Sequence, residues 1–238
     1  GTDTLGRDML VRIIYGARIS LSIGIVACLI NITIGVLYGG IAGYFGGKVD
    51  TIMMRIVDII YSVPTMLYVI LLMVVLKERL VILFEKPFFS VFKSAGPGLF
   101  SVYLAIGLTY WVSMARIVRG QILSLKEQEY VTAARTLGAG GFRILLRHLI
   151  PNCIGPIIVT TMLLIPDAIF TESFLSFIGL GVDAPMASWG SLASDAIGSI
   201  RSYFYLLLYP SLAISITILA FNLFGDGLQD ALDPRMRK

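Results

Sequence analysis

Five long runs without a single Lys, Arg, Asp or Glu constrain this chain more than any other feature of its sequence. They cover residues 19–47, 59–76, 94–115, 148–166 and 202–225. Each is near or above the roughly 17–25 residues with which a helix crosses a bilayer. The charged fraction is 14%, against about 25% in ordinary soluble domains. The sequence therefore predicts an integral membrane protein.

The fold class follows from the hydrogen bonds that the backbone must make in lipid. Its polar groups must be satisfied by a helix or a closed barrel, and the alternating segments of about ten residues that mark a barrel are absent. We predict an all-α polytopic protein with a single transmembrane domain over residues 1–238. The spans are predicted at about 19–46, 59–76, 98–115, 151–171 and 203–225. A short amphipathic helix over 6–17 is expected to lie on the membrane surface before them.

The distribution of basic residues predicts the orientation. The connection at 116–150 carries six Lys and Arg residues, whereas that at 172–201 carries only Arg201 beside three acidic residues. Because cytoplasmic loops are enriched in Lys and Arg, we predict that 116–150 is cytoplasmic and 172–201 external. An external loop at 77–93 and a cytoplasmic C-terminal tail with Arg235, Arg237 and Lys238 follow. The same bias explains the net charge of +4 without nucleic acid.

Two further features bound the chemistry of the chain. It begins with Gly1 rather than Met, and no signal-peptide core follows, so we expect the natural protein to start further upstream. Cys28 and Cys153 are isolated and fit small core residues better than a disulfide or a metal site. No metal site or cofactor is expected in this chain.

The cytoplasmic connection contains two short predicted helices. The first ends near Leu137, where Gly138 is expected to adopt a left-handed conformation. The second has an apolar face (Phe142, Leu145, Leu146, Leu149) and a basic one (Arg143, Arg147). Such a segment can rest on lipid. The small residues Thr132, Ala133, Ala134 and Gly138 instead favour a surface that fits into the groove of a partner protein.

Three residues near the membrane are candidates for a gate or a pathway. Pro64 is an interior proline expected to bend the second span. Asp167 and Glu172 lie near the external end of the fourth span. A packing role competes with the gating role of Pro64, and a carboxylate that accepts hydrogen bonds at the interface competes with substrate contact at Asp167. The glycines of the first span are small enough to let neighbouring helices approach closely, and we expect them to pack against those helices.

The loop also resembles a known family. Ala133 and Ala134, then Gly138 after three residues, then Pro151 thirteen positions later, are similar to the cytoplasmic signature of permease subunits of bacterial binding-protein-dependent ABC importers. Thr132 stands where the family usually has Glu, with Glu129 one helical turn earlier. Further stretches resemble the second of the two paired permeases of the dipeptide, oligopeptide and nickel subgroup, namely residues 1–8, 15–21, 170–181, 188–190 and 224–234.

The resemblance implies a type I importer permease in the bacterial inner membrane, with six spanning helices in the natural protein. It also implies a second homologous permease, two cytoplasmic ATPases that bind ATP and Mg, and an external solute-binding protein. Glu129, Thr132, Ala133, Ala134, Gly138 and Pro151 would couple the chain to the ATPases, so that 116–150 is a coupling loop. The chain itself would be no enzyme.

The substrate and the transport class leave alternatives. A peptide is the expected cargo, and a nickel chelate is the alternative within the family. An ion-coupled carrier or channel is the alternative from another class, although such carriers usually need ionisable groups inside the membrane, of which the runs hold almost none. A membrane-embedded enzyme would need convergent catalytic groups, and the sequence shows none.

Overall fold

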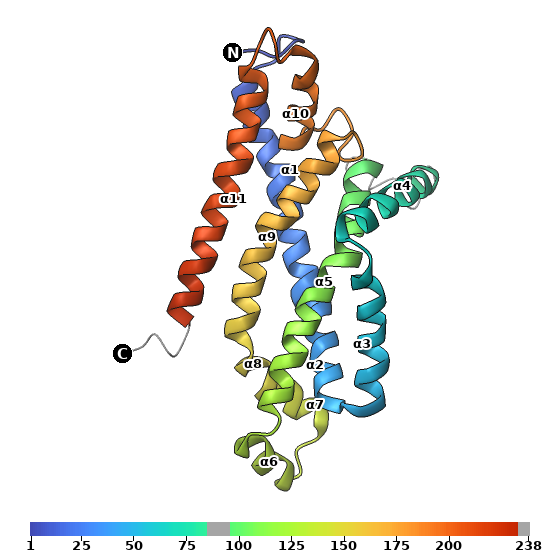
Figure 1. Cartoon of the computed structure of the whole chain (residues 1–238), viewed down its shortest axis with the longest axis vertical. Helices are drawn as coiled ribbons and strands as arrows, with labels where there is room; N and C mark the ends of the chain where they lie inside the picture. The colour runs from blue at the N-terminus through green and yellow to red at the C-terminus, as the bar shows by residue number, and fades with distance from the viewer. Residues whose placement is uncertain (85–95, 233–238) are drawn as a thin grey trace. The chain divides into compact units, whose positions relative to one another are not determined.

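The computed structural model describes residues 1–84 and 96–232, and over these it is built from helices without a named strand. In chain order (Figure 1) the α-helices are α1 (Met9–Ile30), α2 (Val36–Phe45), α3 (Gly47–Ser62), α4 (Thr65–Phe84), α5 (Pro97–Leu125), α6 (Glu129–Thr136), α7 (Gly141–Ile144), α8 (Ile150–Asn152), α9 (Ile154–Phe177), α10 (Trp189–Ala196) and α11 (Tyr205–Leu232). Two π-helical segments, Asn31–Gly35 and Leu145–Leu149, and a 3-10 turn, Ile197–Ser199, complete the order. The predicted basic tail and residues 85–93 of the predicted external loop lie outside the described residues.

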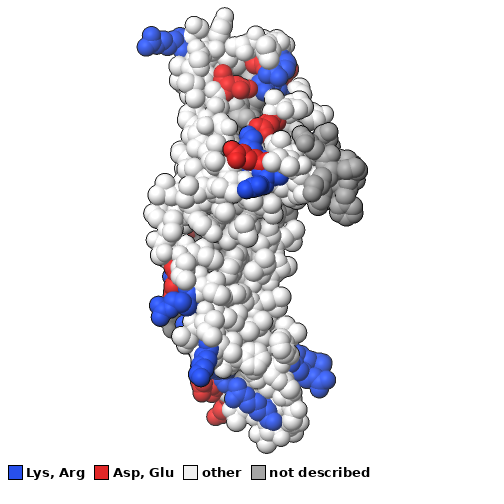
Figure 2. Space-filling model, turned by 90° about the vertical axis from the view of Figure 1, so that its right-hand side faces the viewer, with Lys and Arg blue, Asp and Glu red and all other residues white. Residues whose placement is uncertain are grey.

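Four continuous helical stretches within the described residues are long and apolar enough to cross a membrane. They are Met9–Phe45, Pro97–Leu125, Ile154–Phe177 and Tyr205–Leu232, and α3 with α4 passes the same test as an interrupted pair. On the face drawn in Figure 2, most of the surface is uncharged, and Lys and Arg lie next to Asp and Glu in a few clusters. The all-α prediction is confirmed, and each predicted span falls largely within these helices.

The first helix differs from its prediction. We expected a separate surface helix over 6–17, but α1 begins at Met9 and continues through the π-helical segment into α2. No proline interrupts the stretch, and Gly16 packs closely against α10, where an added Cβ would lie 3.3 Å from the ring of Trp189. The predicted segment is therefore the start of a long helix that packs on α10 at Gly16, while Leu10 and Ile14 of its apolar pattern remain exposed.

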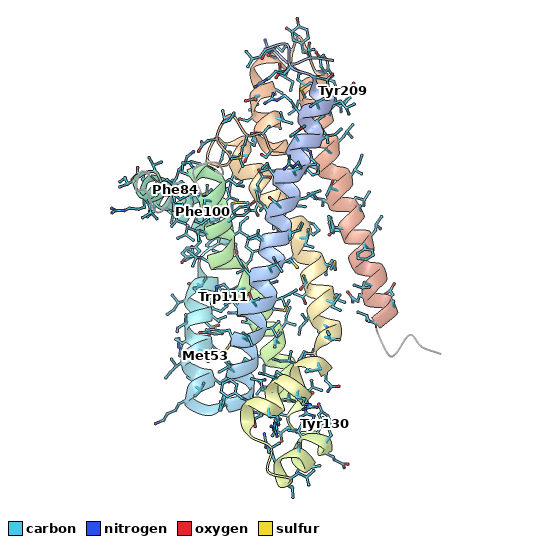
Figure 3. The ribbon with its side chains drawn as sticks, turned by 180° about the vertical axis from the view of Figure 1, so that it is seen from behind. Met53, Phe84, Phe100, Trp111, Tyr130 and Tyr209 are labelled. Carbon is cyan, nitrogen blue, oxygen red and sulfur yellow. The ribbon has the colours of Figure 1, made fainter. Side chains whose placement is uncertain are left out.

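The chain divides into two compact units, and all four continuous stretches contribute to both. The first unit comprises residues 1–27, 65–108 and 164–222. In it, the indole N–H of Trp189 donates to the carbonyl of Ile13 at 2.9 Å, which ties α10 to α1. Phe84 of α4 and Phe100 of α5 lie next to each other in Figure 3. Their rings meet edge to face with the centroids 5.7 Å apart.

The second unit comprises residues 28–64, 109–163 and 223–238. Its main core is a cluster of buried apolar residues from α2, α5, α6, the α7 region and the start of α9: Val36, Met114, Val118, Ile122, Val131, Ile144, Leu145, Leu149, Cys153 and Ile157. A second cluster joins α3 to α5 through Val57, Val112 and Ala115. There the hydroxyl of Tyr38 donates to the carbonyl of Met53 at 2.8 Å, and the centroid of the Tyr38 ring lies 4.7 Å from that of Trp111. Figure 3 labels Met53 and Trp111.

Glycines at every fourth position bring α2 and its π-helical start against α5. An added Cβ would lie 2.2–2.9 Å from a carbonyl oxygen of α5, with Gly35 opposite Trp111, Gly39 opposite Ala115 and Gly43 opposite Arg119. Real Cβ atoms essentially never approach an oxygen so closely, so only glycine fits. The prediction that glycines of the first span serve close helix packing is confirmed at these positions.

Ion pairs fix α3 to α5 on the other side. Arg119 donates to both carboxylate oxygens of Asp50, at 2.6 and 2.5 Å. Arg116 donates to Asp58 at 2.6 Å, and its guanidinium lies 4.0 Å from the centre of the Tyr61 ring. Two-point pairing of the kind that Arg119 makes sets the orientation of the arginine as well as its position.

Candidate functional site

The candidate coupling loop contains α6, which one residue anchors to the core of the second unit. Val131 is fully buried in the main cluster, and Ala134 and Ala139 pack against that cluster. The guanidinium of Arg135 lies 5.7 Å from the centre of the Tyr44 ring at the end of α2. The helix is therefore held on one side, and its other side is left as surface.

A left-handed glycine turns the chain after α6. Gly138 has a φ of 81°, as predicted for the residue after the helix. The N–H of Gly138 donates to the carbonyl of Arg135 at 2.9 Å, and that of Ala139 to Ala134 at 3.0 Å. These bonds satisfy carbonyls at the end of the helix. An added Cβ at Gly138 would meet nothing within 4 Å, so conformation, not space, calls for glycine here.

The exposed side of α6 contains most of the predicted coupling residues. Glu129, Thr132, Ala133 and Gly138 are exposed, and Ala134 is half-buried. We call this surface, together with Leu137, the α6 tip. Its small side chains let another backbone approach closely, and Glu129 lies in the first helical turn, where a negative charge is favoured.

Sequence reasoning missed the most exposed apolar residue of this surface. Leu137 is 88% exposed, directly before the glycine corner. Tyr130 is also exposed on the same helix; Figure 3 labels it. An exposed leucine of this kind adds apolar area to a surface that contacts a partner. The position of Leu137 directly before Gly138 could have indicated this exposure, because a residue in a tight turn has few neighbours to cover it.

The second predicted helix has a different buried face from the one expected. Leu145 and Leu149 of the predicted apolar face are buried, but Phe142 and Leu146 are 59% and 52% exposed, and Ile144 lies in the core instead. The reason is the π-helical segment Leu145–Leu149. Each π turn contains an extra residue, which shifts the positions that face the core.

Pro151 is the second residue of α8, which directly continues the π-helical segment Leu145–Leu149. The predicted fourth span begins there, but the structure interrupts it after Asn152 and starts α9 at Ile154. The side chain of Asn152 donates to the carbonyl of His148 at 2.5 Å. Pro151 is exposed and belongs to the short connection between the coupling loop and α9, not to the α6 tip.

Pro64 interrupts a helix instead of bending one. α3 ends at Ser62, Val63 is extended with φ −91° and ψ 133°, and α4 begins at Thr65. The proline ring disfavours helical geometry for the residue before it, which explains this break. The predicted span over 59–76 is therefore two helices joined at Val63 and Pro64.

Glu172 and Asp167 do not share an environment. Both belong to α9, which extends to Phe177, so Glu172 is not a residue of the external loop as we predicted. Asp167 is exposed, whereas Glu172 is fully buried. Hydroxyl groups surround the Glu172 carboxyl: Ser20 and Ser176 donate to it at 2.8 Å and Ser173 at 3.4 Å.

The serines around Glu172 connect three helices. Ser20 belongs to α1, and its oxygen also accepts the backbone N–H of Trp189 at 3.3 Å. Ser188 caps α10 by accepting the N–H of Ser191 at 3.2 Å, and it also hydrogen-bonds Glu172. We call this group the serine cage. Its members are too far apart in sequence for a pattern to reveal it, and its role is to hold α10 against α1 and α9.

The comparisons with known proteins agree over nearly the whole chain. A family model described as the inner membrane component of binding-protein-dependent transport systems matches residues 35–238. The dipeptide transport system permease protein of Bacillus subtilis (strain 168) is 52% identical, and the match covers 100% of this chain and 69% of that protein. The oligopeptide transport system permease protein of Escherichia coli (strain K12) is 44% identical, with 100% of this chain and 72% of that protein covered.

A solved structure shows the same fold. A chain of the MetNI methionine ABC transporter, in an inward-facing conformation, superposes with a TM-score of 0.66 at 14% sequence identity. The match covers 92% of this chain and 95% of that chain. The predicted permease architecture is thereby confirmed as a fold.

Proposed function

Because the chain belongs to the family of inner membrane components of binding-protein-dependent transport systems, we propose that it is a permease subunit of an ATP-driven importer of peptides. Relatives at 44–52% identity that match its full length are named as dipeptide and oligopeptide permeases. The observation that carries the coupling role is the α6 tip, an exposed small-residue surface fixed by Val131 and ended by Gly138.

The α6 tip is the proposed contact with the ATPases. Small side chains at Thr132, Ala133 and Ala134 let the helix enter a groove of a partner, while Leu137 supplies apolar contact and Glu129 a charge. A push on α6 passes through Val131 into the cluster that includes residues of α2, α5 and α9. Motion of the partner is in this way transmitted to the membrane helices. ATP and Mg would be bound by the ATPases, and this chain would carry no catalytic step.

The other partners follow from the same proposal. A second homologous permease would complete the translocation path, and an external solute-binding protein would deliver the peptide. The C-terminus and the loop 116–150 would face the cytoplasm, in line with the Lys and Arg count. An ion-coupled carrier or channel is not favoured, because the relatives that match the full chain are permeases. Uptake assays with a peptide and with a nickel chelate show which of the two is the cargo.

Gly138→Trp tests the coupling role. An added Cβ at this corner meets nothing within 4 Å. Tryptophan strains the left-handed turn at Gly138, but the turn lies after α6 and outside the membrane helices, so the subunit should still insert and pair with the second permease. We expect the ATPases to be lost from the purified complex, together with ATP-dependent uptake of a radiolabelled dipeptide into proteoliposomes.

Two matched variants complete the experiment. Gly227→Trp adds the same bulk where a Cβ also meets nothing within 4 Å, near the end of α11, and should leave the complex intact. Gly138→Asn keeps a residue that tolerates positive φ and should retain the ATPases. Normal ATPase association and uptake in Gly138→Trp would refute the assignment. Uptake of a nickel chelate but not of any peptide by the wild type would refute the peptide cargo.

A further inference from the structure

Two adjoining clefts lie on the first unit, between α1 and the loop before α10. The first, which we call the Arg18 cleft, has a volume of about 610 Å³ and is lined by Arg7, Arg12, Arg18, Tyr15, Met186 and their neighbours. The second, the Asp195 cleft, has a volume of about 380 Å³ and includes Asp3, Asp195, Ser191 and Leu206. Arg7, Arg12, Pro185 and Met186 line both, so the clefts share a wall.

The Arg18 cleft has three arginines and no acidic residue in its lining. Two of the three are already held by ion pairs: Arg7 with Asp3 at 2.7 Å, and Arg12 with Asp3 at 2.8 Å and Asp195 at 3.3 Å. Arg18 is exposed and lies 5.7 Å from the centre of the Tyr15 ring. Within the described residues no carboxylate pairs with it. The planar guanidinium of Arg18 is therefore available to a carboxylate of a ligand.

The Asp195 cleft offers the opposite charge. The side chain of Asp195 is 60% exposed, although one of its oxygens contacts Arg12. The acidic and basic residues of this cleft balance in charge, so its attraction for an ammonium group comes from the exposed part of the Asp195 carboxylate. The two clefts together thus present a free guanidinium at one end and an accessible carboxylate at the other.

The positions of Arg12 and Arg18 along α1 set the length of ligand that the two clefts can take. Arg12, which contacts Asp195, and Arg18 are six residues apart on α1, or about 9 Å along the helix axis. An extended tripeptide spans about 10 Å at roughly 3.3–3.6 Å per residue. The walls between the charges are Val11, Tyr15, Ile19 and Met186, apolar or adaptable side chains that accept varied peptide side chains.

We propose that the two clefts form a binding site for a short zwitterionic peptide, with its terminal carboxylate on Arg18 and its terminal ammonium on Asp195. This inference rests on the proposed function, because it assigns a peptide site to a peptide permease and places the start of α1 on the external side. It also assigns a role to Arg18, the one of the three arginines in the Arg18 cleft without an ion pair among the described residues.

Binding is tested on the intact complex in lipid nanodiscs without the binding protein, by saturation-transfer NMR with trialanine as the probe. Trialanine amide lacks the terminal carboxylate, and N-acetyl-trialanine lacks the ammonium. We expect each modified peptide to bind the wild type about tenfold more weakly than trialanine, the effect of one charge-assisted contact. Arg18→Gln should bind trialanine and its amide equally, and Asp195→Asn should bind trialanine and the acetylated peptide equally.

Arg201→Gln is the matched control, because Arg201 is also an exposed arginine of the first unit and lines neither cleft. It should keep the full preference for trialanine. Absence of trialanine binding, or an unchanged tenfold preference in Arg18→Gln, would overturn the proposed site. ATP-dependent peptide uptake by the wild-type complex is measured in parallel. Loss of the site with uptake present refutes this inference alone, and absent uptake refutes the proposed function.

Discussion

The carboxyl group of Glu172 in α9 accepts a hydrogen bond of 2.8 Å from the hydroxyl of Ser20 in α1, which lies 152 residues earlier in the chain. The same serine accepts the N–H of Trp189 at the start of α10. One hydroxyl group thus joins three helices. Since all of these groups are buried, each lost bond leaves a polar group without water to replace its partner.

Ser20→Ala is expected to lower the free energy of unfolding by about 1–3 kcal/mol, because Glu172 loses a donor and Trp189 an acceptor inside the protein. Thermal unfolding in detergent gives the loss of stability. Ser124→Ala is the control, because Ser124 is an exposed serine of α5. Equal melting temperatures for the two variants would show that the serine cage contributes nothing to stability.

Gly39→Ala is expected to destabilise the second unit, because its Cβ would lie 2.2 Å from the carbonyl oxygen of Ala115 and the helices must move apart. Overpacking of a close contact costs about 1–3 kcal/mol. Gly155→Ala, where a Cβ meets nothing within 4 Å, should be neutral or slightly stabilising. The yield of folded protein in size-exclusion chromatography and its melting temperature compare the two. A Gly39→Ala protein as stable as the control would contradict the close approach of α2 to α5.

The segment around Asp3 is expected to loosen at acid pH. Burial raises the pKa of Asp3, but hydrogen bonds from the backbone and side chain of Arg7 and the backbone of Leu5 outweigh it and lower the pKa from 3.8 to about 2. A lowered pKa stabilises the folded state above the unfolded pKa and ceases to do so as pH falls through the folded value. The contribution of Asp3 is therefore complete above about pH 5 and lost towards pH 2.

Hydrogen exchange of residues 3–12 measures this effect, after correction for the intrinsic exchange rate at each pH. Protection should fall between about pH 5 and pH 2 in the wild type, a range that includes the unfolded pKa of 3.8 and the folded pKa of about 2. Asp3→Asn should show the low protection already at the upper end of this range and little further change. A wild-type segment with equal protection at both ends of the range would show that Asp3 does not hold it.

Pro64→Ala is expected to slow transport while assembly stays intact. Alanine removes the steric restriction on Val63, whose extended conformation separates α3 from α4, and the two helices can then join. ATP-dependent uptake by the reconstituted complex measures the rate, and co-purification of the partner subunits measures assembly. Pro97→Ala serves for comparison, because Pro97 is the first residue of α5, where a proline is readily exchanged. Unchanged uptake in Pro64→Ala would leave the break with a packing role only.

Local signals in the sequence were sufficient where the structure depends on neighbours in the chain. The left-handed conformation of Gly138 follows from its place after a short helix, and the extended Val63 from the proline behind it. The apolar runs found the helices because lipid leaves the backbone no other hydrogen-bonded form once a barrel is excluded. The position of each run in the sequence was therefore enough to place the spans approximately.

Local helix geometry and tertiary contacts decided the features that the sequence did not reveal. Phe142 and Leu146 fit a helical pattern with Leu145 and Leu149, but a π-helical segment turns them outward. Glu172 was predicted at the start of a loop. Its partners Ser20 and Ser188 come from distant parts of the chain, so no local pattern indicated that it is buried. The start of α1 has the pattern of a surface helix, yet Trp189 of α10 packs against it. For Glu172 and α1 the deciding atoms belong to residues far away in the sequence.

The contact between α2 and α5 restricts how the second unit can rearrange. At Gly39 an added Cβ would meet only backbone atoms of Ala115, and at Gly35 and Gly43 it would meet a carbonyl oxygen together with the side chain of Met114 or Ile122. A small translation of α2 along α5 would place a larger residue opposite a carbonyl oxygen. The nearest register that again matches glycines to carbonyls is four residues away, about 6 Å along the axis. Within this unit the two helices therefore move as one rigid pair during a transport cycle, and any sliding motion must occur at other helix contacts.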